Sequence, residues 1–290
     1  MREKTSLITA DCREKMEHLR NMSGNVLSSH AFVSVYLWRK EMGLFLMMQE
    51  DFYSVKCLWK GENAWFFPCG TDSGKERFIS RHLAEPDFKL CYLTDRDVVF
   101  LGEHYPEKFR CLRDDASDEY IYDREAHIAL SGGDYANVRT QLHRAQRSYA
   151  LRAEPLSAEN RDAALDVILD WASKPHPLAR GLSDDEVDEE AIQKAELLKL
   201  SGVLVYADGV AQAVCAGFPL TEDTFDVCVA KCRQNLPGLS YYAKHALFRS
   251  LEPRFRYVNL EEDLGIPGLR QMKQILSPVR MNELWEAVLL

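Results

Sequence analysis

Residues 202–218 read Gly-Val-Leu-Val-Tyr-Ala-Asp-Gly-Val-Ala-Gln-Ala-Val-Cys-Ala-Gly-Phe, two apolar runs around a central Asp208-Gly209 pair. Asp-Gly is a favoured two-residue turn between antiparallel strands, because both of its positions accept positive φ. The stretch therefore predicts a β-hairpin, and the elements on either side can be placed relative to it.

The second half of the chain has an informative order of elements around this hairpin. Two helices precede it, and a strand, a loop, a helix, a strand and a helix follow. This is the order of an acetyltransferase-like (GNAT) fold, in which the loop after the central strand leads into a helix whose free amides can bind a pyrophosphate. The expected helices span residues 158–173, 189–200, 241–251 and 267–275, and the expected strands after the hairpin span 224–231 and 257–261.

The first half shows a similar order, although no sequence is repeated. Helices are expected over 6–22, 29–41, 71–83 and 95–101, and strands over 44–49, 53–59, 64–68, 89–94 and 120–122. We therefore expect an α+β chain of two acetyltransferase-like domains in tandem, each a mixed sheet flanked by helices. The expected division is an N-terminal domain over 1–134, a basic connecting helix over 135–153 and a C-terminal domain over 154–290.

The expected connecting helix has an unusually basic face. The stretch NVRTQLHRAQRSY, residues 137–149, contains Arg139, His143, Arg144 and Arg147, and helical periodicity places its apolar residues on the opposite face. One interpretation is a solvated helix surface. The other is an anion site for a phosphate, a pyrophosphate or an RNA backbone, because the planar fork of arginine meets phosphate oxygens two at a time.

Composition limits the classes of function. The net charge of -9 over 290 residues disfavours general nucleic-acid binding, although a local basic face is compatible with a focused contact. No run approaches 18 apolar residues and the N-terminus lacks an apolar signal core, so we expect no stable membrane insertion and no secretion. The eight cysteines form no CxxC pair and the eight histidines form no i, i+4 pair. We therefore expect a reduced, cytoplasmic protein with no metal site.

Two glycine-containing stretches bear on phosphate binding. Gly70-Thr-Asp-Ser-Gly-Lys75 is one residue short of a nucleotide phosphate loop, and Glu76 stands where a magnesium-binding Ser or Thr is needed, so this function is excluded. The loop Gln234-Asn-Leu-Pro-Gly-Leu-Ser240 has one glycine where loops that bind acyl-CoA have several. Gly238 and Ser240 still begin a helix, whose amides are candidates to bind a phosphate or to stabilise an oxyanion.

The densest cluster of candidate catalytic residues is Asn259-Leu-Glu-Glu-Asp-Leu-Gly-Ile-Pro-Gly-Leu-Arg270. A carboxylate at the end of a strand, Glu262 or Asp263, is a candidate general base that takes a proton from an attacking amine or hydroxyl. Arg270 is a candidate to orient that base or to hold an anionic substrate. The alternative is structural: both acids cap the helix and pair with Arg270 or Lys273.

Four segments together resemble one bacterial family, an uncharacterised group allied to the C-terminal domain of phosphatidylglycerol lysyltransferase. They are Ser29-His-Ala-Phe-Val-Ser-Val-Tyr-Leu-Trp38, Asp118-Glu-Tyr-Ile-Tyr-Asp123, Leu130-Ser-Gly-Gly-Asp-Tyr135 with the basic helix, and 259–270. The resemblance implies tandem acetyltransferase-like domains related to Fem-type aminoacyltransferases. It places Arg139 and Arg144 in the family's basic helix, and Glu262, Asp263 and Arg270 in its acidic-glycine segment.

The resemblance also implies a reaction. Characterised relatives move an aminoacyl group from a charged tRNA to a lipid or peptide acceptor, and the lipid-modifying members carry a large membrane domain that this sequence does not contain. We therefore expect an aminoacyltransferase that acts on an amine or hydroxyl of a small molecule or peptide, with the basic helix facing the space between the two halves. The alternatives are a non-catalytic binding module and an acyl-CoA-dependent N-acyltransferase. No cofactor is expected beyond the donor, aminoacyl-tRNA or acyl-CoA, and no oligomeric state is indicated.

Overall fold

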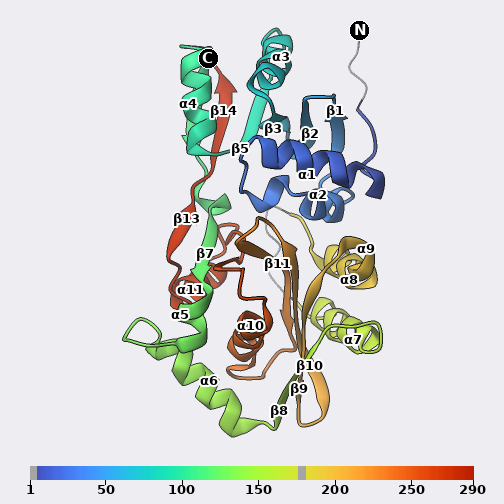
Figure 1. Ribbon diagram of the computed structural model, residues 1–290, viewed down its shortest axis with the longest axis vertical. Coiled ribbons are helices and arrows are strands. Elements are labelled where there is room, and N and C mark those ends of the chain that lie inside the picture. The colour runs from blue at the N-terminus through green and yellow to red at the C-terminus, as the bar shows by residue number, and fades with distance from the viewer. Residues whose placement is uncertain (1–4, 176–180) are drawn as a thin grey trace. The chain divides into compact units, whose positions relative to one another are not determined.

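The computed structural model describes residues 5–175 and 181–290 (Figure 1). The chain forms two compact units: unit 1 consists of Met1–Glu119 and Asn282–Leu290, and unit 2 of Tyr120–Met281. This division differs from the boundaries expected at 134 and 154. The basic helix lies inside unit 2, and the C-terminal residues belong to unit 1.

Unit 1 is a mixed sheet with helices, in the strand order β1-β2-β3-β5-β14-β6, and β4 pairs with β2. All its strand pairs are antiparallel except β3 and β5, which run parallel, and α3 lies in the connection between them. The elements are η1 (Ala10–Cys12), α1 (Arg13–Met22), η2 (Ser28–His30), α2 (Phe32–Trp38), β1 (Phe45–Met48), β2 (Phe52–Trp59), β3 (Glu62–Phe66), β4 (Cys69–Gly70), α3 (Asp72–His82), β5 (Lys89–Leu93), α4 (Asp95–His104), β6 (Phe109–Arg113), η3 (Asp115–Ser117) and β14 (Trp285–Leu289).

The second sheet has the order β13-β7-β12-β11-β10-β9-β8. In it β11 and β12 pair in parallel, and α10 connects these two strands. The elements are β7 (Glu119–Asp123), α5 (Arg124–Ala129), α6 (Ala136–Ser148), β8 (Leu151–Pro155), α7 (Arg161–Ala172), α8 (Asp185–Gln193), α9 (Ala195–Leu198), β9 (Ser201–Ala207), β10 (Val210–Pro219), β11 (Thr224–Cys232), α10 (Leu239–Ser250), β12 (Tyr257–Asn259), α11 (Pro267–Ile275) and β13 (Arg280–Asn282).

The structure confirms the fold class, an α+β chain with two mixed, acetyltransferase-like sheets flanked by helices. The hairpin of β9 and β10 is confirmed as well, with positive φ at both Asp208 (53°) and Gly209 (84°). One helix expected over 189–200 is instead two, α8 and α9. Lys194 breaks it, because its backbone (φ -105°, ψ 19°) leaves the helical region.

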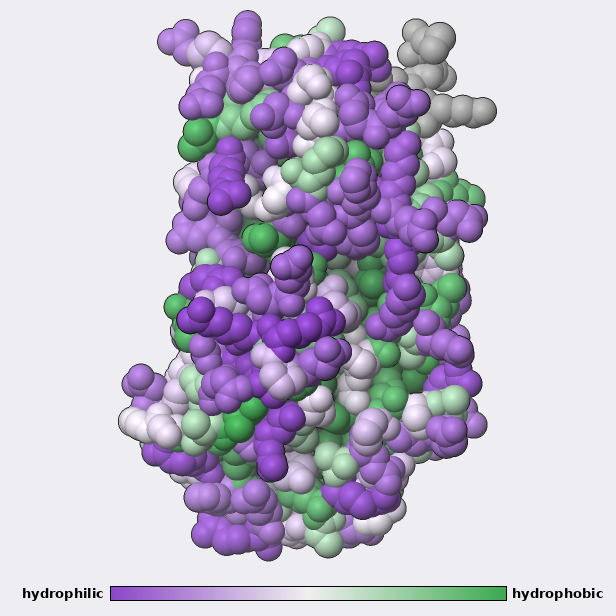
Figure 2. Space-filling model, in the orientation of Figure 1, coloured by the Kyte–Doolittle hydropathy of each residue, from purple (hydrophilic) through white to green (hydrophobic). Residues whose placement is uncertain are grey.

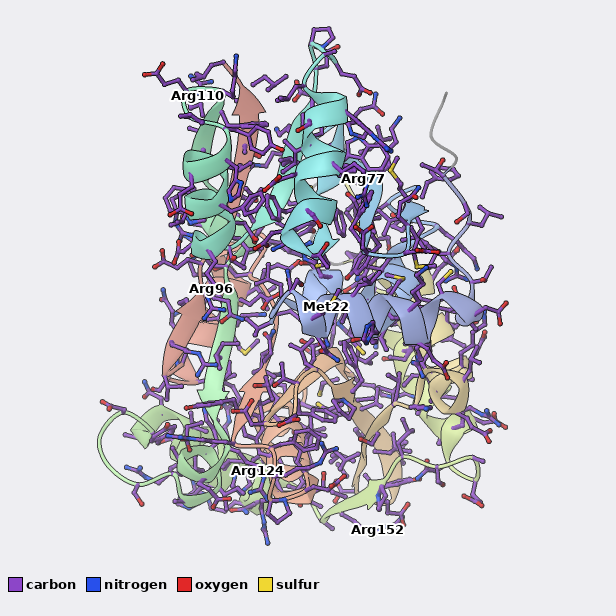
Figure 3. All side chains as sticks on the ribbon, turned by 45° about the horizontal axis from the view of Figure 1, so that its top comes forward. Met22, Arg77, Arg96, Arg110, Arg124 and Arg152 are labelled. Carbon is purple, nitrogen blue, oxygen red and sulfur yellow. The ribbon has the colours of Figure 1, made fainter. Side chains whose placement is uncertain are left out.

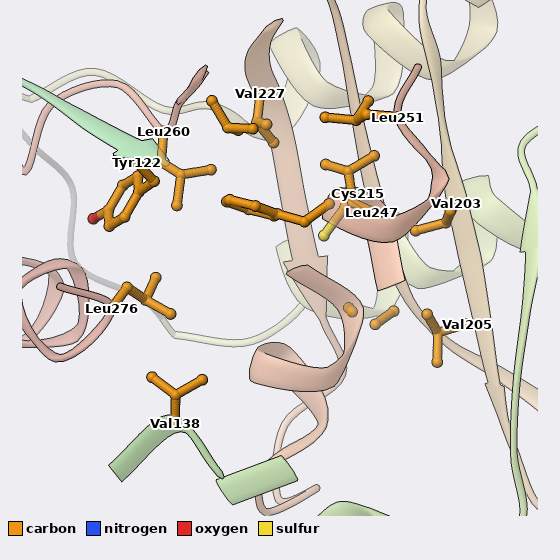
Figure 4. Close-up of a cluster of buried hydrophobic side chains, with 14 of the residues drawn as sticks. Tyr122, Val138, Val203, Val205, Cys215, Val227, Leu247, Leu251, Leu260 and Leu276 are labelled. Atoms are coloured by element: carbon orange, nitrogen blue, oxygen red, sulfur yellow. The ribbon is translucent and has the colours of Figure 1, made fainter. Parts of the chain in front are cut away.

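The core of unit 2 fixes α10 against its sheet (Figure 4). Leu247 of α10 packs in one cluster with Val203, Val205 and Cys215 of the sheet, and Leu276 after α11 belongs to the same cluster. Removing this apolar surface from water is the main force that sets the position of the helix.

The C-terminal end of α10 is fixed by a buried cation. Arg124 donates from Nε to the carbonyl of Phe248 at 3.0 Å and from Nη2 to the carbonyl of Leu251 at 2.9 Å (Figure 3). These carbonyls have no partner within the helix, so the guanidinium satisfies them. Helix α10 is therefore held both by apolar packing and at its end.

The surface is largely hydrophilic on the face that Figure 2 shows, with smaller apolar areas between the charged side chains. Among residues 5–175 and 181–290, none of the helices has both the length and the apolar character that crossing a membrane requires.

Candidate functional site

The parallel strands of unit 2 stop pairing part of the way along. Their register runs from Thr224 opposite Tyr257 to Asp226 opposite Asn259, where β12 ends, whereas β11 continues to Cys232. The chain leaves the sheet at this point and turns into α11. In open α/β sheets, ligands bind outside the carboxyl ends of strands where neighbouring connections separate. The acidic segment 259–270 begins at such a place.

The segment after β12 turns sharply and is held by polar side chains. Glu261 (φ 59°), Leu264 (φ 55°) and Gly265 (φ 73°) have left-handed backbone. Asn259 Oδ1 accepts the N–H of Glu261 at 2.7 Å, and Asp263 Oδ1 accepts the N–H of Gly265 at 2.8 Å. The segment therefore has one defined conformation, and its two buried polar residues satisfy the amides of the turn.

Asp263 is fully buried and strongly paired. Tyr120 OH donates to Oδ2 at 2.6 Å, and Arg270 donates from Nε at 2.7 Å and from Nη2 at 3.1 Å. Burial alone would raise the pKa of Asp263, but the hydrogen bonds from Arg270 and Tyr120 outweigh it and hold the pKa below its usual range. Asp263 is therefore suited to hold this segment in place rather than to take up a proton. The N-cap of α11 is Ile266, with no side-chain cap, so neither acid caps this helix.

Glu262 has a different environment from Asp263. Its side chain is half-buried, and no hydrogen bond or ion pair of its carboxylate occurs within the described part of the chain. Lys273 of α11 is buried, and its Nζ donates to the carbonyl oxygens of Leu260 and Glu261, the latter at 2.9 Å. Burial lowers the pKa of Lys273 to about 8, and the negative charge of Glu262 opposes this shift. The carboxylate of Glu262 therefore makes no hydrogen bond or ion pair in the described chain, and its charge acts on the buried amine of Lys273.

The basic side chains of α6 lie in two environments, one bonded to the preceding loop and the other exposed to solvent. Arg139 donates from Nη1 to the carbonyls of Leu130 at 2.5 Å and Gly132 at 2.7 Å, so it holds the loop that precedes its own helix. The other basic side chains on this helix face solvent. They are His143, Arg144 and Arg147.

Gly238 lies against α6. It is the N-cap of α10 with φ 81°, and a Cβ atom there would lie 2.2 Å from the carbonyl oxygen of Gln141 and 3.1 Å from the backbone nitrogen of Ala145. Ser240, in the first turn, is half-buried and caps nothing. The helix start that binds a pyrophosphate in acyl-CoA enzymes is therefore closely packed by another helix in this chain.

We expect Gly238→Ala to destabilise unit 2 by about 2–4 kcal/mol, because the new methyl group overlaps the Gln141 carbonyl and the backbone is left-handed. Thermal or urea unfolding measures the change. Gly133→Ala is the control, since its Cβ meets nothing within 4 Å, and it should unfold like the unaltered protein. Equal stability of the two variants would contradict the close packing of α6 on α10.

Unit 1 has a pocket of about 240 Å³ at the corresponding place, beyond the ends of its parallel strands β3 and β5. Lys75 lines it, buried, with Nζ 3.2 Å from Asp72 Oδ1 and 5.3 Å from the ring centre of Phe100. The Gly70–Lys75 stretch therefore leads into helix α3, and its lysine forms an ion pair with Asp72. In neither unit do the described residues bring together three or more His, Cys, Asp or Glu side chains that could hold a metal ion.

The structure adds residues that sequence reasoning did not assign. Tyr120 enters the cluster from a strand far away in sequence, and no local pattern points to it. Lys273 was considered only as an ion-pair partner. Lys244 carries a signal that was missed: it lies on the apolar side of α10, beside Ala243 and Leu247, and a lysine at such a position is unusual.

The family model described as phosphatidylglycerol lysyltransferase, C-terminal, matches residues 20–287. No curated protein gives a significant match. A conserved protein of unknown function from Bacteroides thetaiotaomicron has 23% identity and a TM-score of 0.88, over 99% of both chains. The C-terminal domain of a putative lysylphosphatidylglycerol synthetase from Agrobacterium fabrum has 15% identity and a TM-score of 0.68, over 96% of this chain and 92% of that one. L-PGS from Bacillus licheniformis has 16% identity and a TM-score of 0.64, over 95% and 91%.

Proposed function

Because the chain belongs to the family of phosphatidylglycerol lysyltransferase C-terminal domains, we propose that it is an aminoacyltransferase. Its donor is a charged tRNA, and its acceptor carries a hydroxyl or amine. The observation that carries the proposal is the segment after β12: the Glu262 carboxylate makes no hydrogen bond or ion pair in the described chain, and its charge acts on Lys273, a buried amine held by the carbonyls of Leu260 and Glu261. Acyl transfer needs a base for the acceptor and a positive charge for the oxyanion, and these two residues supply both.

In the proposed reaction, Glu262 takes the proton of the acceptor O–H or N–H as that atom attacks the carbonyl carbon of the aminoacyl ester. Lys273 uses two N–H groups on backbone carbonyls, and its third N–H stabilises the oxyanion of the tetrahedral intermediate. The bond to the ribose oxygen of the tRNA then breaks, and Glu262 returns its proton to that oxygen. Asp263 and Arg270 hold the segment that presents Glu262.

An acyl-CoA donor is disfavoured by the packing of the α10 N-terminus. The carbonyl of Gln141 lies where any side chain at Gly238 would be. Helix α6 therefore packs against the N-terminus of α10, where a diphosphate would have to bind. The names of two solved structures with the same fold, a putative lysylphosphatidylglycerol synthetase and L-PGS, favour a lysyl group as the first aminoacyl group to test.

The test is transfer of labelled lysine from charged tRNA by the purified chain. Vesicles with phosphatidylglycerol and a soluble peptide with a free amine are offered as separate acceptors. The proposal expects label in one acceptor fraction at a rate that depends on protein concentration. Binding of charged tRNA without transfer to either acceptor or to water would indicate a non-catalytic module, and retention on coenzyme A without tRNA binding would indicate the acyl-CoA alternative.

We further expect the double variant Arg144→Ala, Arg147→Ala to bind tRNA roughly tenfold more weakly in about 0.1 M salt. The reason is that two phosphate contacts are lost. The same loss reduces the magnitude of the negative slope of log K for tRNA binding against log salt concentration by about 1.5. Filter binding at several salt concentrations measures both quantities. A matched double variant, Arg161→Ala with Arg249→Ala, removes the same charge from other helices of unit 2 and should bind normally. Equal loss in the two double variants would mean that only net charge matters.

A further inference from the structure

The pocket of unit 1 lies at the carboxyl ends of two parallel strands. The last paired residues of β3 and β5 are Phe66 and Cys91. Pro68 follows β3 and Thr94 follows β5, and both line the pocket. In open sheets, ligands bind outside the carboxyl ends of such strands. The pocket volume of about 240 Å³ is below the range of about 300–1,000 Å³ that is typical for drug-sized ligands, so the pocket suits a smaller molecule.

Helix α4 places two opposite charges on the wall of this pocket. Arg96 lies in its first turn and Glu103 in its last turn, with Val99 and Phe100 between them, and all four residues line the pocket. This spacing puts them on one face of the helix. Both charges have the sign that the helix dipole disfavours, because the N-terminus of a helix favours acids and the C-terminus favours bases. Neither charge therefore stabilises α4 through the dipole.

Arg96 and Glu103 also differ from the other charged residues around the pocket. Neither of them makes a hydrogen bond or an ion pair in the part of the chain that the structure describes. The remaining charged side chains that line the pocket have partners, in three pairs: Lys75 with Asp72, Asp97 with Thr94, and His104 with Glu76. One cation and one anion thus remain for a ligand.

The guanidinium of Arg96 reaches a second wall of the pocket (Figure 3). Its Nη1 lies 3.6 Å from the position that a Cβ atom would take at Gly24, in the loop after α1. Lys75, which is 8% exposed, adds a buried cation, with Nζ 5.3 Å from the ring centre of Phe100. Within the described chain its only hydrogen bond goes to Asp72, so two of its three N–H groups can be donated to a ligand.

We propose that this pocket binds a small zwitterion of the amino-acid class. The carboxylate of the ligand accepts N–H groups of Arg96 and Lys75, its ammonium group donates to Glu103, and its apolar part lies against Phe100. An anion alone would leave Glu103 without a partner, and a cation alone would leave Arg96 without one, so the two charges favour a ligand that has both. This site belongs to unit 1 and goes beyond the reaction proposed for the segment after β12.

The experiment measures binding of each standard amino acid, and of inorganic phosphate, to the full chain by calorimetry at millimolar concentration. We expect at least one amino acid to bind. Its deaminated and its decarboxylated analogue should each bind at least tenfold more weakly, because each lacks one of the two charges. Arg96→Gln and Glu103→Gln should each lower the affinity for the amino acid at least tenfold. The control Arg110→Gln removes an exposed arginine of unit 1 that does not line the pocket, and it should bind normally.

Thermal unfolding of the ligand-free variants separates binding from a structural role. Arg96 and Glu103 make no bond in the described chain and oppose the helix dipole, so both variants should melt at the temperature of the unaltered chain or slightly above it. A loss of affinity at normal stability then supports the site. Binding of no amino acid, tighter binding of phosphate than of any amino acid, or equal affinities of Arg96→Gln and Arg110→Gln would overturn the inference.

Discussion

Replacing Glu262 with Gln should slow aminoacyl transfer by about 10²–10⁴-fold and leave the melting temperature unchanged. Gln has the same shape but does not accept the proton of the acceptor, so attack on the ester loses its general base. The fold should tolerate the change because the Glu262 carboxylate makes no hydrogen bond or ion pair with the rest of the described chain. The rate is measured as label transferred per minute under saturating charged tRNA, with the melting temperature of the same sample.

The matched control is Glu222→Gln, an exposed glutamate in the turn before β11 that should transfer at the normal rate. The affinity of Glu262→Gln for charged tRNA should also stay within about twofold, because a base acts on the chemical step rather than on donor binding. A variant that transfers at the normal rate would remove Glu262 from the mechanism. A loss of rate together with a loss of stability would assign it a structural role.

Replacing Asp263 with Ala should destabilise unit 2 by about 2–4 kcal/mol, because the buried hydroxyl of Tyr120 loses its acceptor and the partly exposed Arg270 loses its carboxylate. Arg270 would lose its carboxylate, and the hydroxyl of Tyr120 and the N–H of Gly265 would lose their acceptor. Urea unfolding at pH 7 measures the loss. The control Asp134→Ala removes an exposed acid and should change the free energy of unfolding by less than about 0.5 kcal/mol.

The same residue gives an expected pH dependence. The pKa of Asp263 in the folded chain lies below its usual range because the hydrogen bonds from Arg270 and Tyr120 outweigh the effect of burial. The unfolded value is about 3.9. The stability that Asp263 contributes is therefore fully present above that pH and is lost as pH falls through the folded pKa. The difference between the unaltered chain and Asp263→Ala should shrink below about pH 4, and a constant difference would contradict the assigned ionisation.

Local patterns in the sequence were sufficient to predict much of the secondary structure of unit 2. The Asp208-Gly209 turn predicted the hairpin because its two positions need positive φ, a property of two neighbouring residues. The final helix was predicted over 267–275, where α11 lies, from apolar periodicity and a proline at its start. Local signals do not decide every helix cap: at the start of α3, Thr71 accepts the N–H of Gly74 at 3.0 Å, although Ser73 is a second candidate cap two residues later. Several polar residues compete near a helix start, and only the backbone geometry selects one.

The sequence located the candidate site within one segment, but it did not show which residue of that segment does what. Three acids after a strand, followed by glycines and a proline, marked residues 259–270 because such a pattern is uncommon in a plain connection. The difference between Glu262 and Asp263 depends on side chains brought from elsewhere. Tyr120, which lies on β7, and Arg270, on α11, donate hydrogen bonds to Asp263, whereas the charge of Glu262 opposes the lowering of the pKa of Lys273.

The sequence by itself determined the kind and order of most elements, because turn chemistry and apolar periodicity involve residues within a few positions of one another. The strands β6, β8, β13 and β14 were not predicted. Only the tertiary structure decided which strands pair and which charges are buried. The clearest case is β14, which pairs antiparallel with both β5 and β6, although residues 285–289 lie far from both in the chain. Backbone hydrogen bonds between strands are the same for any side chain, so no pattern of residues predicts which strands β14 pairs with. Burial of Lys244 and Lys273 likewise depends on what packs around them, and that is settled only when the whole sheet has formed.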